Sequence, residues 1–237
     1  MISERRLVSS HSSFWRHAMP MGDSFVRFMN ASLVRFNVPC DQVSKSNRNS
    51  LISELSFRLY KSKVEEGKKI LGKDEFYSNL KELSTDVVNY IKLLERSNSV
   101  PNMNAKEISE AKLWAHRLSA FSAHMCPGQS ILIQPKFDGC GIVDRCEGDI
   151  LIGKTLWELK NVERDFRLAD IKQLLTYCSL NYASKQYTIE SVGLVNSRLG
   201  VCFETKIESL AAMAAAMSES ELLGEVVNYI TMDGPSK

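Results

Sequence analysis

The sequence has six cysteines but lacks any C-x-x-C pair. That spacing excludes the usual zinc and thiol-redox motifs. Cys178 and Cys202 lie in apolar patterns, so we expect both to be buried thiols. Scattered cysteines of this kind are typical of a reduced, cytoplasmic protein.

Long hydrophobic runs are also missing. No apolar run approaches the roughly 20 residues that a transmembrane helix needs, so we expect no membrane contact. Residues 1–8 contain no hydrophobic signal core, and nothing in them directs export. We see no internal repeat and no low-complexity tract.

Charge of either sign is not in large excess. The net charge of the 237 residues is +2, and 44% of them are hydrophobic and 24% charged. This composition is that of an ordinary globular protein with a sizeable core. The mild basic balance neither demands nor excludes a nucleic-acid partner.

The pattern of apolar residues predicts a helical N-terminal region over residues 1–103 and a second domain over 104–237. Apolar stripes at helical spacing predict helices near 51–59 and 74–96. Asn104 with Glu107 three residues later predicts a capping box at the start of the next helix. From residue 131 the expected order is three strands, a helix, two strands and a helix. The fold class is therefore α/β (α+β) with a mixed sheet.

Residues 131–144 are expected to form one long strand with a bend at 138–141, and a β-hairpin follows at 148–160. A turn at Gly153 and Lys154 sets the facing pairs of this hairpin. These pairs are Ile152 with Thr155, Leu151 with Leu156, Ile150 with Trp157, and Asp149 with Glu158.

Alternation along the second strand puts Glu158 and Lys160 on one face, with Asp149 opposite. Two carboxylates beside an amine can hold a divalent metal next to a lysine that positions water. Without further context, a solvated face with cross-strand ion pairs explains the same residues.

The helix expected over 168–183 supplies that context, because Gln173 and Tyr177 lie one turn apart on one of its faces. Asp149, then Glu158-Leu159-Lys160, then Gln173 and Tyr177 in a Q-x-x-x-Y motif, resembles the PD-(D/E)XK nuclease superfamily in its RecB-like branch. The resemblance covers about residues 105–205. It implies a restriction-endonuclease-like αβββαβ core.

The resemblance also implies a role for each motif residue. Asp149, Glu158 and the backbone carbonyl of Leu159 would hold Mg²⁺ or Mn²⁺, and Lys160 would orient the attacking water. Gln173 and Tyr177 would position substrate or support the metal site. A glutamate of the first core helix, Glu107 or Glu110, would assist. The cysteines lack the spacing of an iron–sulfur cluster, so none is expected.

Asp144 is an alternative first ligand, because Gly141-Ile142-Val143-Asp144 has the G-x-x-D form that RecB-like members often carry. We prefer Asp149, which the two-residue turn sets directly opposite Glu158.

Three cations are candidates for nucleic-acid binding: Arg164, Arg167 and Lys172. They follow the predicted catalytic strand, where they would meet phosphates. An equally good interpretation is a solvated loop in which Glu163 and Asp165 pair with these cations.

The leading functional hypothesis is a metal-dependent nuclease that hydrolyses DNA phosphodiester bonds, as an effector or subunit of a prokaryotic defence, restriction or repair system. The alternative is a nucleic-acid-binding or assembly subunit on a nuclease fold. Its protein partner, or a second copy, would bind through the helical N-terminal region. A structural domain with a fortuitous motif is the third hypothesis.

Overall fold

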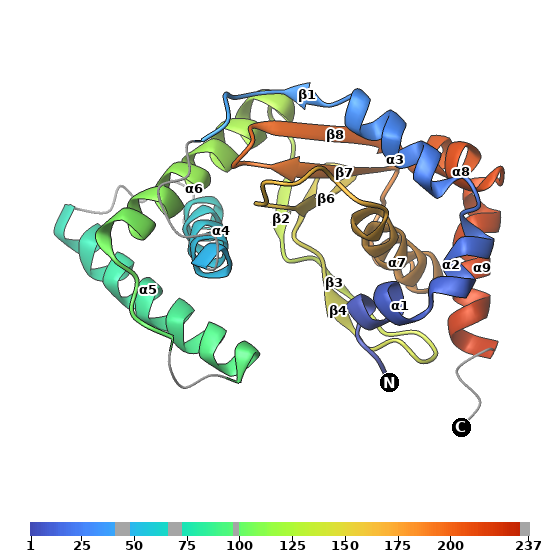
Figure 1. Cartoon of the computed structure of the whole chain (residues 1–237), viewed down its shortest axis with the longest axis horizontal. Helices are drawn as coiled ribbons and strands as arrows, with labels where there is room; N and C mark the ends of the chain where they lie inside the picture. The colour runs from blue at the N-terminus through green and yellow to red at the C-terminus, as the bar shows by residue number, and fades with distance from the viewer. Residues whose placement is uncertain (41–47, 66–72, 97–99, 233–237) are drawn as a thin grey trace.

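A computed structural model describes residues 1–40, 48–65, 73–96 and 100–232. Over these residues the chain is a mixed α/β protein with nine helices and a mixed six-stranded sheet. The sheet and the helices packed on it form the larger part of the molecule. Helices α4 (Asn49–Glu65) and α5 (Lys73–Glu95), together with the first half of α6 (Ala105–Met125), project from it as a helical arm (Figure 1).

The sheet has the order β1-β8-β7-β6-β5-β2. Only β6 (Thr155–Leu159) and β7 (Ser191–Asn196) are parallel neighbours, and α7 (Leu168–Ser184) connects them. The other pairs are antiparallel, and they bring in β1 (Val34–Arg35), β8 (Val201–Lys206), β5 (Ile150–Ile152) and β2 (Ile131–Ile133). A helix must cross between parallel neighbours, which explains the place of α7.

The hairpin of β5 and β6 has the register expected from its turn. Ile150 faces Trp157, Leu151 faces Leu156, and Ile152 faces Thr155. Gly153 in the turn has a φ of 57°, which an L side chain rarely adopts. The predicted pairs are confirmed for these strand residues.

The two faces of the hairpin pack against different cores. Leu151 and Leu156 join a cluster with α7, while Ile150 and Trp157 join a cluster with α6. Strand alternation therefore directs Glu158, which is buried, to the side that α7 covers. On the other face, a Cβ atom at Gly193 would meet the Trp157 ring at 2.3 Å, so this position in β7 must be glycine.

The first forty residues pack with the second half of the chain. Helices α1 (Glu4–Ser10), α2 (Ser12–Ala18) and α3 (Gly22–Ala31) contribute to the cluster that also holds α7, α8 (Ile207–Ala215) and α9 (Glu219–Met232). Strand β1 then adds to the sheet beside β8. Residues of the region expected over 1–103 therefore contribute to the core of the domain expected over 104–237.

The long strand expected over 131–144 was wrong. Gln134 has a φ of 52° and Pro135 has no N–H, so the chain leaves the main sheet after β2. Strand β3 (Lys136–Phe137) pairs instead with β4 (Cys146–Glu147) in a separate two-stranded ribbon. Val143 makes only isolated bridges.

Other local predictions are confirmed. Asn104 and Glu107 form the capping box of α6, and Ser218 with Glu221 caps α9 in the same way. The thiols of Cys178 and Cys202 are both buried. No helix in the described ranges is long and apolar enough to cross a membrane.

Candidate active site

Lys160 lies directly after β6 and is held at its ammonium group by two side chains. Its Nζ donates to Glu158 Oε1 at 2.8 Å and to Gln173 Oε1 at 2.9 Å. Because α7 covers this face of the sheet, Gln173 of the helix reaches Lys160 at the end of β6. The structure thus brings together three of the residues that the sequence singled out.

Asp149 immediately precedes β5 and points toward β6. Its Oδ2 accepts a hydrogen bond of 2.7 Å from the backbone N–H of Leu159. Its carbonyl accepts a bond of 2.9 Å from the Gln134 N–H, where the chain turns away from β2. Asp149 therefore lies beside the Glu158–Lys160 segment, as the hairpin register predicts.

Asp144 lies elsewhere, in the loop between β3 and β4. Its N–H donates to the carbonyl of Ile2 at 2.9 Å. Among the described residues no contact joins Asp144 to Glu158 or Lys160. The geometry favours Asp149 as the partner of Glu158.

Tyr177 extends the chain of contacts from Lys160 into the core. Gln173 Nε2 donates to the Tyr177 hydroxyl at 2.8 Å, and the tyrosine ring stacks on Phe137 at 5.4 Å between centroids. Burial raises the pKa of Tyr177, so the hydroxyl stays protonated. The Lys160 ammonium can only donate, so the Gln173 oxygen faces Lys160 and its NH2 group faces the Tyr177 hydroxyl.

Burial and proximity shift the pKa values of both acids. Burial, followed by the charge of Asp149, raises the pKa of Glu158 to about 8. Burial also raises the pKa of Asp149. For Lys160, burial is the largest influence and would lower the pKa, but the charge and hydrogen bond of Glu158 together with the charges of Asp170 and Asp149 raise it. Lys160 is therefore a cation at neutral pH, and it donates hydrogen bonds rather than accepting a proton.

The carboxylates fit a divalent cation. Glu158 Oε2 is buried without a hydrogen-bond partner among the described residues, which costs free energy unless a cation meets it. No group of three or more His, Cys, Asp or Glu side chains in the described ranges could hold a metal ion. Mg²⁺ needs only one or two carboxylates, because it keeps waters and binds substrate phosphate. Asp149 and Glu158 supply such a pair.

Asp170 is a member of the site that sequence reasoning missed. Its carboxylate accepts two hydrogen bonds from Arg164, at 2.8 and 3.1 Å, and one from the Arg167 N–H at 2.8 Å. Asp170 Oδ1 also lies 3.9 Å from Lys160 Nζ. An acidic residue in the first turn of a helix was the available signal, since it caps free N–H groups there.

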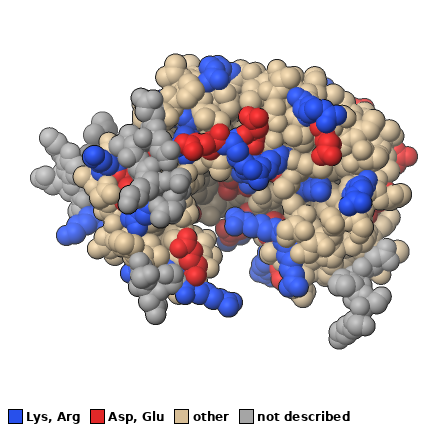
Figure 2. Space-filling model, in the orientation of Figure 1, with Lys and Arg blue, Asp and Glu red and all other residues tan. Residues whose placement is uncertain are grey.

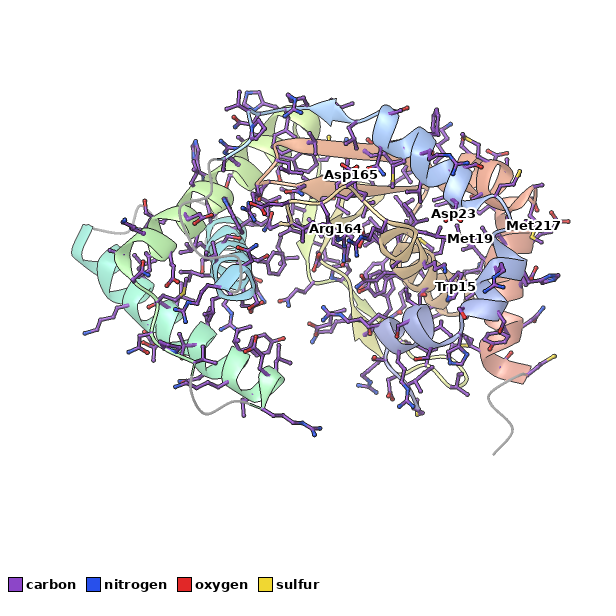
Figure 3. The ribbon with its side chains drawn as sticks, viewed as in Figure 1. Trp15, Met19, Asp23, Arg164, Asp165 and Met217 are labelled. Carbon is purple, nitrogen blue, oxygen red and sulfur yellow. The ribbon has the colours of Figure 1, made fainter. Side chains whose placement is uncertain are left out.

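The three predicted phosphate-binding cations do not share one surface. Arg164 is bound to Asp170, on the side of α7 toward the helical arm, whereas Trp15 lies on the opposite side in this view (Figure 3). Lys172 Nζ lies 5.8 Å from the centroid of that Trp15 ring, and burial lowers its pKa. Arg167 is exposed where α7 begins.

Glu107, one of the two acids of α6 that the resemblance implies, takes part in a separate ion pair. Glu107 accepts from Arg48 at 2.7 Å and from the Asn104 N–H at 2.8 Å, in the first turn of α6. The charge of Glu110 acts on the thiol of Cys40. An acid of α4, Glu54, lines the same cleft as Asp149, and its charge adds to the rise in the pKa of Asp149 that burial leads. Contacts between positions so far apart in sequence carry no local signal.

Asp149 lies on the wall of a cleft of about 620 Å³ between the helical arm and the hairpin. Helices α4 and α5 form one side, and Gln134, Glu147, Gly148 and Arg5 complete the other. Figure 2 shows the hollow, with basic and acidic side chains both present around it. Substrate entering this cleft would reach the Asp149 carboxylate directly.

Comparison with known proteins identifies no relative: no protein-family model, no curated protein and no solved structure matches the chain.

Proposed function

We propose that the protein is a metal-dependent nuclease that hydrolyses phosphodiester bonds in DNA. One observation carries the proposal. Asp149 lines a cleft and accepts a hydrogen bond from the segment that carries the paired Glu158 and Lys160, and one buried oxygen of Glu158 has no partner within the described chain. An apolar or fully paired arrangement would be more stable, so a cation site explains why these groups lie together.

The order of elements supports the proposal. Helix α6, strands β2, β5 and β6, helix α7 and strand β7 follow one another as in the αβββαβ core that the sequence resemblance implies. The ribbon of β3 and β4 is an addition between the first two of these strands.

In this proposal each residue has a distinct role. Asp149 and Glu158 hold Mg²⁺ or Mn²⁺, which supplies stabilisation of negative charge on the phosphate. Lys160, cationic and fixed by Gln173, orients the attacking water and donates to a phosphate oxygen as its charge develops. Tyr177 keeps the Gln173 amide in place.

The decisive experiment compares Lys160→Ala with Lys154→Ala. Lys154 lies in the turn of the same hairpin, exposed and paired with Glu190, so it serves as a matched control. We expect the wild type and Lys154→Ala to cut DNA with Mg²⁺ or Mn²⁺, and Lys160→Ala to be slower by about 100-fold or more. Equal cleavage by Lys160→Ala, or cleavage that a chelator does not stop, would refute the assignment.

A second candidate is an assembly subunit that binds DNA and needs a partner for cleavage. It is favoured by Leu93 and Leu94, which are 79% and 60% exposed in the last turns of α5. In that case the wild type would bind DNA without cutting it until the partner, or a second copy, is added.

A further inference from the structure

We infer that the cleft between the helical arm and the hairpin takes single-stranded DNA, with bases stacked on the arm and the backbone passing Asp149. The inference rests on the proposed function, because it names the form of DNA that reaches the same site. It concerns α4 and α5, which lie outside the segment that carries the motif.

The size of the cleft limits what can enter. Its volume of about 620 Å³ is that of a pocket that encloses a small molecule. A few nucleotides of one strand fit such a space. A duplex does not, because both strands and their paired bases would have to enter together. Duplex DNA could therefore touch the rim but not bring a phosphate to Asp149.

The arm offers a surface for stacking. Tyr90 of α5 lines the cleft and is 40% exposed, and Phe57 of α4 lines the same wall. The guanidinium of Arg58 lies 5.2 Å from the centroid of the Tyr90 ring. Unpaired bases stack on exposed aromatic rings and on arginine planes, whereas paired bases already stack on each other.

The charges of the cleft also favour one strand. Its cations are balanced by acids, since Arg58 pairs with Glu54 at 2.7 Å and Lys61 lies 3.8 Å from Glu65. Duplex binding depends on many unpaired Lys and Arg side chains, because the duplex carries about one charge per 1.7 Å. One strand carries half that density, so stacking can supply most of the affinity.

A bridge across the cleft sets its width beside Asp149. Lys61 Nζ of α4 donates to Gln134 Oε1 at 2.6 Å, and the Gln134 N–H donates to the Asp149 carbonyl at 2.9 Å. The arm is thus tied to the segment that carries the first carboxylate. A strand held on the arm would lie at a defined distance from that carboxylate.

The test uses the full chain with one labelled oligonucleotide, either alone or annealed to its complement in a blunt duplex. With Mg²⁺ or Mn²⁺ we expect the single strand to be cut at least tenfold faster than the duplex. Equal or faster cutting of the duplex would overturn the inference.

If neither form is cut, the proposed function fails, and binding then decides the inference by itself. Fluorescence anisotropy with the Lys160→Ala variant should show the single strand bound at least tenfold more tightly. Equal binding of both forms, or no binding, would overturn it.

Variants of the arm test where the strand lies. Tyr90→Ala should weaken single-strand binding about tenfold, and Tyr90→Phe should retain it, because stacking needs only the ring. Lys106→Ala is the control, since Lys106 is exposed on α6 and does not line the cleft. Unchanged binding by Tyr90→Ala with normal folding would overturn the placement on the arm.

Discussion

Two buried ion pairs of this protein look alike but differ in what surrounds them. Glu158 pairs with Lys160 at 2.8 Å beside the cleft, and Glu107 pairs with Arg48 at 2.7 Å in the helical arm. Both glutamate side chains are 5% exposed. Similar distances and burial would suggest similar roles.

The difference lies in the remaining oxygen. Glu107 Oε2 accepts from Arg48 and from the Asn104 N–H, and the hydrogen bond of Arg48 leads the causes that lower its pKa. Glu158 Oε2 has no partner in the described chain, and burial leads the causes that raise its pKa to about 8. An ion pair in which both carboxylate oxygens are hydrogen-bonded stabilises a fold. An ion pair with one buried oxygen left without a partner indicates a site for a ligand or metal ion.

The largest expected effect is on the cleavage rate, which only one of the two ion pairs should control. Glu158→Gln should reduce metal-dependent cleavage about 100-fold or more, because it removes a charged ligand for the cation. Glu107→Gln should cut at nearly the wild-type rate at 20 °C, since that pair lies away from the cleft. Initial rates on one DNA substrate would measure this. Loss of activity in a correctly folded Glu107→Gln variant would contradict a purely structural role for the Glu107–Arg48 pair.

The free energy of unfolding should rank the two substitutions in the opposite order. Glu107→Gln leaves Arg48 without its charged partner and should lower the free energy of unfolding by about 2 kcal/mol. Glu158→Gln in metal-free protein should cost less, because the raised pKa of Glu158 shows that its charged form is disfavoured there and Lys160 keeps its hydrogen bond to Gln173. Urea unfolding followed by circular dichroism would measure both. Strong destabilisation by Glu158→Gln would contradict the comparison.

Glu158 and Glu107 should change the free energy of unfolding in opposite directions as the pH rises. Between about 4.5 and 8 the folded state holds a proton on Glu158 that the unfolded state releases, so this group lowers stability as pH rises through that window. The pKa of Glu107 is lowered, so its stabilisation is present above 4.5 and is lost as pH falls below it.

Urea midpoints of metal-free protein from pH 3 to 9 test both signs. We expect Glu158→Gln to flatten the profile between pH 5 and 8, and Glu107→Gln to flatten it below pH 4.5. A Glu158→Gln profile parallel to that of the wild type would show that Glu158 does not titrate in this window.

The smallest expected effect is stabilisation by metal. Mn²⁺ at ten times its dissociation constant should add about 1.4 kcal/mol to the wild type and raise its melting temperature by a few degrees. Glu107→Gln should show the same shift, and Glu158→Gln none. Differential scanning fluorimetry with and without chelator would measure it. An equal shift in Glu158→Gln would place the metal elsewhere.

Much of the candidate site was predictable because its geometry is local. A two-residue turn determines which hairpin residues face each other, and strand alternation puts Glu158 and Lys160 on one side. Helical periodicity does the same for Gln173 and Tyr177. Each of these rules connects residues within about a dozen positions of one another.

The sequence by itself determined the hairpin register, the helix after it and the capping box of α6. Only the tertiary structure decided that Lys61 donates to Gln134, that Glu54 lines the same cleft as Asp149, and that the arm forms one wall of that cleft. The reason is physical. Turn geometry and periodicity act along the chain, whereas these contacts depend on how separate elements pack, and their partners are chosen by burial and charge in three dimensions.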